Sequence, residues 1–202
     1  MKTVLITGAN RGIGLGHAQR FAQRGIEVFA TARAPDAADE LHRLAQAYPG
    51  RFTVLHYDAH AADAPVRLKS ALADRPLDLV LANAGASGES GQALGNIHVD
   101  GVLDLIRVNA LAPLKLVEAL IYNITLSERK LVAFQSSRMG SIGDNHSGGS
   151  YEYRLSKAAL NMGARNVAHD LKSRGVIAVT LHPGWVRPAW AGQVHPCRWR
   201  TR

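Results

Sequence analysis

Tyr153 and Lys157 stand four residues apart in a stretch with helical periodicity, so both side chains lie on one face of a helix. A phenol ordinarily titrates near pH 10, and a neighbouring ammonium group lowers that pKa by favouring the phenolate. The pair therefore suits proton exchange with a substrate oxygen, and the lysine can also hold a ribose. A surface Tyr/Lys pair with no such role is the alternative, and the surrounding sequence decides between them.

Ser137 follows an apolar run at residues 131–135 that has the pattern of a buried strand. Open α/β sheets bind ligands at the carboxyl ends of their strands, where a serine hydroxyl can hydrogen-bond a substrate carbonyl. Asn83-Ala84-Gly85 ends another such run, and its small residues leave room for the adenine and ribose of a cofactor. His182-Pro183-Gly184 ends a third and turns the chain near a nicotinamide. These segments place the Tyr/Lys pair in a cofactor site.

A glycine-rich turn directly follows the first apolar run, with the sequence Thr7-Gly8-Ala9-Asn10-Arg11-Gly12-Ile13-Gly14. Glycines permit a tight strand-to-helix turn and let the backbone approach a pyrophosphate, which then meets free N–H groups at the helix N-terminus. The spacing is Gly-x-x-x-Gly-x-Gly, and its place between the first strand and the first helix favours a dinucleotide site over an ordinary turn.

The end of the second strand indicates which dinucleotide binds. An acidic residue there would accept hydrogen bonds from the ribose hydroxyls, whereas an arginine attracts a 2′-phosphate. The sequence is Thr31-Ala32-Arg33, and Arg11 adds a second cation nearby. Asp36 follows a proline and fits better as a helix N-cap. We expect NADP(H) to be preferred, with NAD(H) as the alternative.

Six short apolar runs alternate with longer helical patterns, which predicts an α/β fold with a parallel sheet and helices on both faces. The Gly/Ser-rich stretch 140–150 is typical of a loop near a ligand. The expected strands are residues 3–6, 27–31, 52–57, 77–82, 131–135 and 176–181, and the expected helices are 13–24, 36–47, 62–73, 99–121 and 151–174.

Composition narrows the class of protein. The 202 residues suit one domain, with 47% hydrophobic and 20% charged residues. The net charge of +8 suggests nucleic acid, but residues 187–202 hold four arginines and no acid, and the rest carries only +4 without a basic stripe. The sequence has no apolar stretch of about 20 residues, so it predicts no membrane span. The single cysteine, Cys197, and the absence of a Cys/His cluster predict no metal and a cytoplasmic location.

Together these motifs resemble the classical short-chain dehydrogenase/reductase family over residues 1–187. The stretches that follow Ser137, Tyr153 and His182 are similar to its C-factor and carbonyl-reductase-like branch. The resemblance implies a Rossmann-like doubly wound sheet with strand order 3-2-1-4-5-6. It also implies hydride transfer between NADP(H) and a small carbonyl or alcohol substrate. A non-catalytic, C-factor-like dinucleotide-binding signalling protein, an inactive truncated member of the family, and a basic nucleic-acid binder are the alternatives.

The resemblance assigns roles to matching positions. It makes Tyr153 the general acid/base, Lys157 the group that lowers its pKa and binds the ribose, and Ser137 the group that polarises the carbonyl. Asn109 would hold a water in a proton relay to Lys157. Asp58 would contact adenine, Asn83 would support the cofactor pocket, and Ser156 would only pack on the cofactor side. The implied cofactor contacts also include Tyr153 itself, Pro183, Gly184 and Val186.

The match with the family also has departures and open points. Ala82 replaces a usual asparagine, Ser137 and Tyr153 lie 16 residues apart instead of 13, and Pro188 replaces a cofactor-binding threonine. The family commonly dimerises through the helices around Asn109 and Tyr153, so we expect a homodimer. The substrate itself cannot be read from this sequence.

Residues 188–202 form an atypical basic tail with two of the three tryptophans and no acid. Codons that spell this tail also read, from their third base, Gly-Met-Gly-Gly and then Ser-Val-Glu-Asp, which resembles the family's usual continuation. We therefore expect a frameshift near Arg187 that removes the final helix and seventh strand, with a naturally short tail as the alternative. Poor solubility and weak activity are expected, and restoring the other frame should reverse both.

Overall fold

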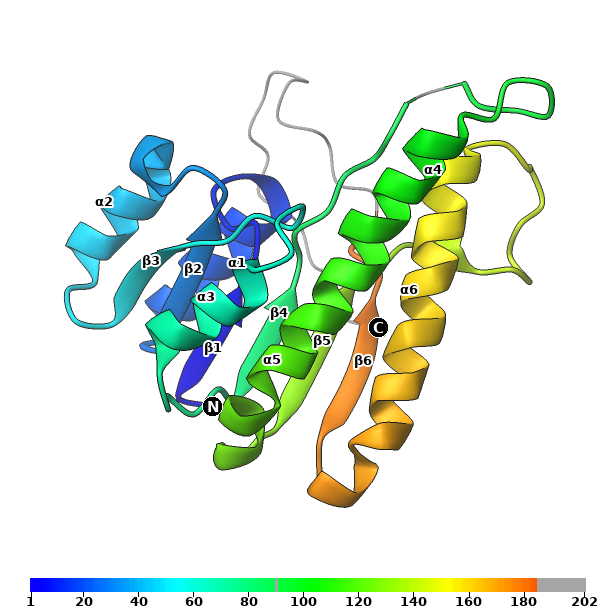
Figure 1. Cartoon of the computed structure of the whole chain (residues 1–202). Coiled ribbons are helices and arrows are strands. Elements are labelled where there is room, and N and C mark those ends of the chain that lie inside the picture. The colour runs from blue at the N-terminus through cyan, green and yellow to red at the C-terminus, as the bar shows by residue number, and fades with distance from the viewer. Residues whose placement is uncertain (90, 185–202) are drawn as a thin grey trace.

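A six-stranded parallel sheet with strand order β3-β2-β1-β4-β5-β6 forms the centre of the molecule, so the predicted order is confirmed (Figure 1). The computed structural model describes residues 1–89 and 91–184. The strands are β1 Thr3–Ile6, β2 Glu27–Ala32, β3 Phe52–His56, β4 Leu79–Ala82, β5 Leu131–Gln135 and β6 Ile177–Leu181.

Helices cover both faces of this sheet, and two hydrophobic clusters separate them from the strands. Val4 and Ile6 of β1 pack in one cluster with the side of α1, while Leu5 between them packs in the other with α3 and α5. A strand buried on both faces needs apolar residues at every position, which explains the continuous runs in the sequence. The helices are α1 Gly12–Gln23, α2 Asp39–Ala47, α3 Ala64–Leu72, α4 Val99–Ile106, α5 Ala112–Leu126 and α6 Tyr151–Asp170.

The helix expected over residues 99–121 is interrupted in the structure. α4 and α5 are joined by a π-helical segment, Arg107–Leu111, that holds Asn109. Pro113 in the first turn of α5 has no N–H to donate to the carbonyl of Asn109, four residues before it, so regular α-helical bonding cannot continue there. The widened turn sets the direction of Asn109, which the structure places at the site.

The expectation that Asp36 caps a helix is wrong. Pro35–Ala37 forms a 3-10 turn, and α2 begins only at Asp39 with Ala38 before it. Asp39 and Glu40 occupy the first turn of α2, where carboxylates interact favourably with the helix dipole. The side chain of Asp36 is exposed.

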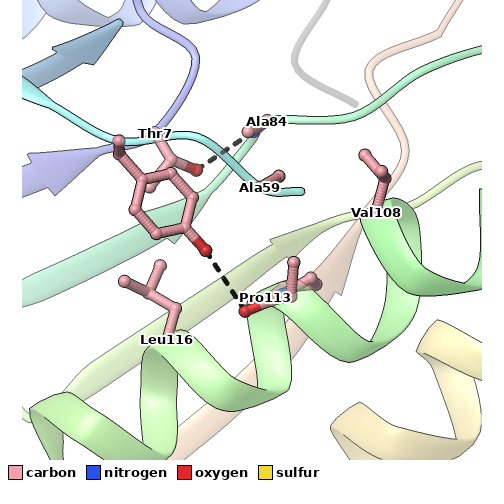
Figure 2. A pocket seen from close by; sticks show the side chains of 8 residues that line it. Thr7, Ala59, Ala84, Val108, Pro113 and Leu116 are labelled. Carbon is pink, nitrogen blue, oxygen red and sulfur yellow. Dashed lines mark hydrogen bonds between the residues drawn. The ribbon is translucent and has the colours of Figure 1, made fainter. Parts of the chain in front are cut away.

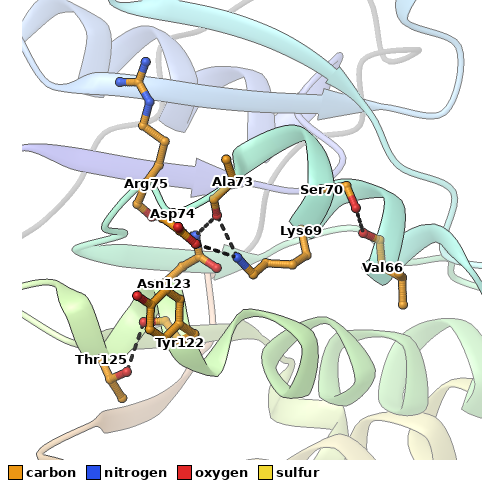
Figure 3. Close-up of polar contacts among 9 residues, drawn as sticks. All are labelled: Val66, Lys69, Ser70, Ala73, Asp74, Arg75, Tyr122, Asn123 and Thr125. Atoms are coloured by element: carbon orange, nitrogen blue, oxygen red, sulfur yellow. Dashed lines mark hydrogen bonds and ion pairs between the residues drawn. The ribbon is translucent and has the colours of Figure 1, made fainter.

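The connection from α3 to β4 is fixed on α5 at the amino-terminal edge of the sheet (Figure 3). The Nδ2 of Asn123 donates to the carbonyls of Ala73 and Arg75, both at 2.8 Å. The Nζ of Lys69 also donates to Ala73 and lies 5.3 Å from the centre of the Tyr122 ring. These contacts hold β4 in register, and the carboxyl end of β4 then reaches the site.

No helix within residues 1–89 and 91–184 is both long and apolar enough to cross a membrane.

The strand β6 packs against the core on one face only. The side chains of Ile177 and Val179 are 55% and 43% exposed, whereas Ala178 between them packs against the core below α6.

Candidate active site

The glycine turn between β1 and α1 is shaped by close backbone packing. A Cβ on Gly14 would lie 2.3 Å from the carbonyl oxygen of Gly8 and 2.6 Å from the Nδ2 of Asn83. Gly8 itself has a φ of +63° and lies against Ala84, which follows the neighbouring strand β4. A Cβ on Gly12 would instead meet nothing within 4 Å. The turn is thus tight on its inner side and open on its outer side.

The N-terminus of α1 is free to bind an anion. The residue before it, Arg11, makes no capping side-chain bond, and the first turn holds no acidic residue. The first N–H groups of a helix have no partner within the helix, and they carry the positive end of its dipole. An open glycine turn with uncapped N–H groups fits a pyrophosphate, as the sequence predicts.

Thr7 and Asn83 tie the glycine turn to β4, as Figure 2 shows for Thr7 and Ala84. The Thr7 Oγ1 accepts from the N–H groups of Asn83 and Ala84, both at 3.0 Å. The Asn83 Nδ2 donates to the carbonyls of Thr7 and Gly8 at 2.9 and 3.0 Å. Asn83 therefore holds the glycine turn in place, and its support of a cofactor stays a prediction. Thr7 also holds the turn and was missed from sequence, because a threonine at a strand end has many other uses.

Arg33 and Asp58 follow the carboxyl ends of β2 and β3, on the outer side of the glycine turn. The N–H of Ala9 in the glycine turn donates to Thr31 at 2.8 Å, which brings the end of β2 beside the turn. Arg33 and Arg11 are both exposed there. The backbone N–H of His60 and, more weakly, the Arg33 cation hold the pKa of Asp58 below its usual range. The edge thus has two free cations and one ionised carboxylate.

Ser137, Tyr153 and Lys157 are brought together where β5 meets α6. The Lys157 Nζ lies 5.6 Å from the centre of the Tyr153 ring and donates to the Gln135 carbonyl at 2.8 Å. Lys157 is only 6% exposed, and burial lowers its pKa to about 8. Burial also raises the pKa of Tyr153, which a hydrogen bond with Ser137 partly offsets.

Lys157 was expected to lower the pKa of Tyr153, but in the protein without bound cofactor this pKa is raised. The ammonium group is directed to the Gln135 carbonyl and lies over the ring, so desolvation of the phenol dominates. The phenol therefore remains protonated at neutral pH. This is the form that can donate a proton to a substrate oxygen.

The low pKa of Lys157 predicts a pH-dependent stability. Between pH 8 and its ordinary value of 10.5, the unfolded chain holds a proton on Lys157 that the folded chain has lost, so the free energy of unfolding rises with pH. The full rise is up to about 3 kcal/mol at 1.36 kcal/mol per pKa unit. Urea unfolding at pH 7, 8, 9 and 10 should show it, and Lys157→Met should remove it. Parallel curves for the parent and the Lys157→Met variant would contradict the assignment, and Lys172→Met at an exposed position is the control.

Asn109 and Ser156 form a second buried group beside the Tyr/Lys pair, and both are 0% exposed. The Asn109 Nδ2 donates to the Ala86 carbonyl at 2.8 Å and to the Ser156 Oγ at 3.0 Å, and its Oδ1 accepts from the Ala86 N–H at 2.8 Å. Both N–H groups of the Asn109 side-chain amide therefore already have acceptors in the protein. A water in the predicted proton relay would have to donate a hydrogen bond to an oxygen of Asn109. Ser156 was expected only to pack, and this is wrong: its hydroxyl accepts from Asn109 and donates to the Tyr153 carbonyl.

Further contacts fix β5 to α6, the helix that carries Tyr153 and Lys157. The Ser136 Oγ donates to the Asn161 Oδ1 at 2.6 Å, and the Asn161 Nδ2 donates to Gly140 at 3.1 Å. A Cβ on Gly140 would lie 2.7 Å from the backbone of Lys157. Asn161 stands one helical turn beyond Lys157, and this spacing is the signal that could have identified it.

The turn after β6 lies beside Ser137. The N–H of Ser136 donates to the Leu181 carbonyl at 2.8 Å, and the N–H of Arg138 donates to the His182 Nδ1 at 3.4 Å. Pro183 and Gly184 follow at the same sheet edge. Val186, Pro188 and the whole predicted tail, 188–202, lie outside the residues that the structure describes.

Comparison with known proteins decides the family. The family model of short chain dehydrogenases matches residues 2–197. The chain belongs to the short chain dehydrogenase family. It is therefore a member of a family of oxidoreductases, and the predicted membership is confirmed.

Two curated relatives are similar in sequence to this short chain dehydrogenase. It is 36% identical over 188 residues to the 1-hydroxy-2-glutathionyl-2-methyl-3-butene dehydrogenase of Rhodococcus sp. (strain AD45), covering 92% of this chain and 78% of the relative. It is 41% identical over 117 residues to the C-signal protein of Myxococcus xanthus, covering 58% and 70% of the two chains.

Solved structures agree with the short chain dehydrogenase fold. A carbonyl reductase from Pseudomonas aeruginosa PAO1 in complex with NADP superposes with a TM-score of 0.84 at 38% identity, covering 93% of this chain and 84% of that one. The carbonyl reductase Sniffer of D. melanogaster superposes with a TM-score of 0.87 at 30% identity, covering 97% and 86%.

Proposed function

We propose that this short chain dehydrogenase transfers a hydride between NADP(H) and a small carbonyl or alcohol substrate, using one domain over residues 1–187. The observation that carries the proposal is the convergence of Ser137, Tyr153 and the buried Lys157 at the sheet edge that also holds the glycine turn. The similarity to a carbonyl reductase in complex with NADP supports this choice of reaction and cofactor.

Tyr153 and Ser137 act on the substrate oxygen in this proposal. Bound NADPH supplies the hydride for the carbonyl carbon. The Tyr153 phenol, kept protonated by burial, gives its proton to the carbonyl oxygen as negative charge develops there. Ser137 donates a hydrogen bond to the same oxygen and orients the carbonyl. In the oxidative direction Tyr153 takes the proton back from the alcohol.

Lys157 and the glycine turn hold the cofactor. The Lys157 ammonium has three N–H groups, of which one binds Gln135, so two remain for a ribose. The uncapped N–H groups at Gly12 and Ile13 bind the pyrophosphate, next to Gly8, Asn10 and Gly14. Asp58 contacts the adenine, and Arg11 and Arg33 bind the 2′-phosphate. The turn at Pro183, Gly184 and Val186 supports the nicotinamide end.

Arg33→Ala is expected to weaken NADPH binding by about tenfold or more and to leave NADH binding nearly unchanged, because only NADPH carries the 2′-phosphate. Fluorescence titration of both cofactors measures the two affinities. Arg24→Ala, an exposed arginine at the other end of α1, is the matched control. Equal loss for both cofactors, or a parent chain that already prefers NADH, would contradict the role of Arg33.

A screen of aldehydes and ketones with NADPH tests the proposed reaction directly. We expect NADPH oxidation that depends on a carbonyl substrate. The similarity to the C-signal protein favours a second candidate, a signalling protein that binds the dinucleotide without turning it over. NADPH binding without turnover on any carbonyl would favour that candidate over the enzyme.

We also propose a homodimer through α4 and α6. These helices expose large apolar side chains, which are Val99, Leu103, Leu155 and Met162 at 66%, 57%, 46% and 64%. Helices that pair with a second copy would bury them. Analytical ultracentrifugation measures the state, and a monomer at high micromolar concentration would contradict the proposal.

A further inference from the structure

Glu152 is a buried carboxylate immediately before Tyr153 in α6, and it is 2% exposed. Its Oε2 accepts from the backbone N–H of Glu89 at 3.1 Å, and its Oε1 accepts from the side-chain amide of Gln92. Within residues 1–89 and 91–184 it makes no ion pair with a lysine, arginine or histidine. His98, which pairs with Glu89, has a ring nitrogen within 4.8 Å of this carboxylate but not bonded to it. A buried carboxylate needs hydrogen bonds to its oxygens, and the Glu89 N–H and the Gln92 amide supply them.

Gln92 is bonded to the start of α6 from both its side chain and its backbone. It is 5% exposed, and its Oε1 accepts from the N–H of Glu152 at 3.0 Å. Its backbone carbonyl accepts from the N–H of Ser150, also at 3.0 Å. Ser150 precedes α6 with a φ of +49° and makes no capping bond of its own, so Gln92 accepts from the Glu152 N–H that an N-cap side chain would otherwise serve.

Two glycines make room for this pair. A Cβ on Gly88 would lie 2.3 Å from the Glu152 Oε2, and a Cβ on Gly101 would lie 2.2 Å from its Oε1. Gly88 belongs to the connection between β4 and α4, and Gly101 belongs to α4 itself. The carboxylate therefore fits between three segments only because both positions lack a side chain.

The connection between β4 and α4 is thus fixed to α6 at two places. Near its start, Ala86 binds Asn109, which in turn binds Ser156. Further along, Gln92 binds Glu152. Residues 152 and 156 are one helical turn apart and stand on either side of Tyr153 in sequence. The two attachments therefore set the position of the connection relative to the Tyr153 phenol.

We propose that Gln92 and Glu152 form a latch that positions the β4–α4 connection, residues 83–89 and 91–98, against the catalytic helix. Both are positioning residues, because neither contacts the reacting atoms. The latch keeps the connection, which begins at Asn83-Ala84-Gly85, at a fixed distance from Tyr153, and in the proposed reaction it thereby shapes the space beside the phenol. Its effect on turnover rests on the proposed function, whereas its effect on the backbone does not.

Exchanging the two side chains gives a sharp test. Gln92→Glu sets two carboxylates against each other, and Glu152→Gln turns an amide N–H₂ toward a donor. In the double exchange, the new amide at position 152 can donate to the new carboxylate at position 92 and still accept from the Glu89 N–H. The carboxylate at position 92 can still accept from the N–H of residue 152. The double variant thus restores every bond of the pair.

We expect each single variant to lose hydrogen-exchange protection at the N–H groups of Glu89, Ser150 and residue 152. We also expect at least a tenfold rise in KM for the carbonyl, with a smaller change in kcat and unchanged NADPH affinity. The double variant should recover both protection and KM. Gln92→Ala gives a milder single variant should Gln92→Glu fail to fold, and Glu118→Gln at an exposed position of α5 is the control.

Retained protection in the single variants, or a double variant no better than either one, would overturn the latch. Lost protection with an unchanged KM would overturn its positioning role. Hydrogen exchange needs no turnover, so a parent chain that shows the expected protection but reduces no carbonyl contradicts the proposed function and leaves the latch standing.

Discussion

Tyr153→Phe is expected to lower kcat by about 10²–10⁴-fold, the usual contribution of a positioned general acid. The substitution removes the phenolic proton beside the substrate oxygen and keeps the ring over which the Lys157 ammonium lies. NADPH affinity should remain nearly unchanged, because the phenol is not a main anchor of the cofactor. Initial rates of NADPH oxidation and a fluorescence titration measure the two quantities.

Tyr151→Phe is the matched control for this variant, since Tyr151 lies two residues earlier on the same helix and has no proposed role in proton transfer. Its kcat should equal that of the parent. Near-normal turnover in the Tyr153→Phe protein, or an equal loss in both variants, would remove Tyr153 as the acid.

Gly14→Ala is expected to open the glycine turn. The new Cβ would overlap the Gly8 carbonyl at 2.3 Å and the Asn83 amide at 2.6 Å, and neither can move without releasing the turn from β4. Overpacking of this kind costs about 1–3 kcal/mol in the free energy of unfolding. NADPH affinity should fall at least about tenfold, because the displaced N–H groups no longer converge on the pyrophosphate.

Gly16→Ala provides the comparison on the same helix. A Cβ at Gly16 meets nothing within 4 Å, and alanine favours a helix over glycine by up to about 1 kcal/mol. This variant should be slightly more stable and bind NADPH as the parent does. Urea unfolding and NADPH titration of both variants check the pair, and equal NADPH affinities would rule out the proposed role of the turn.

The sequence predicted the fold well because its strongest signals are local. Continuous apolar runs predicted all six strands to within two residues at each end, and the glycine turn identified the junction between β1 and α1. Ser137 was predicted at the carboxyl edge of the sheet because it follows a strand, and Tyr153 and Lys157 on one helix face because they are four residues apart. The family resemblance then predicted that the three act together. The structure confirms that these three side chains converge at that edge.

Features that depend on tertiary contacts could not be predicted in the same way. The sign of the Tyr153 pKa shift depends on burial and on the direction of the Lys157 amine, which points to Gln135. The pairing of Asn109 with Ser156 and that of Gln92 with Glu152 join residues that are far apart in sequence. A glutamine in a loop carries no local signal that it will meet a buried carboxylate 60 residues later.

The proposed reaction is direct hydride transfer from NADPH to a carbonyl carbon with protonation by Tyr153. A single-turnover reaction with enzyme in excess over NADPH deuterated at its transferable position tests it most directly, because even slow transfer leaves a label. Mass spectrometry of the alcohol should find deuterium on the carbinol carbon with the parent chain and far slower labelling with Tyr153→Phe. Bound NADPH that gives no labelled alcohol from any aldehyde or ketone in the panel would contradict the account.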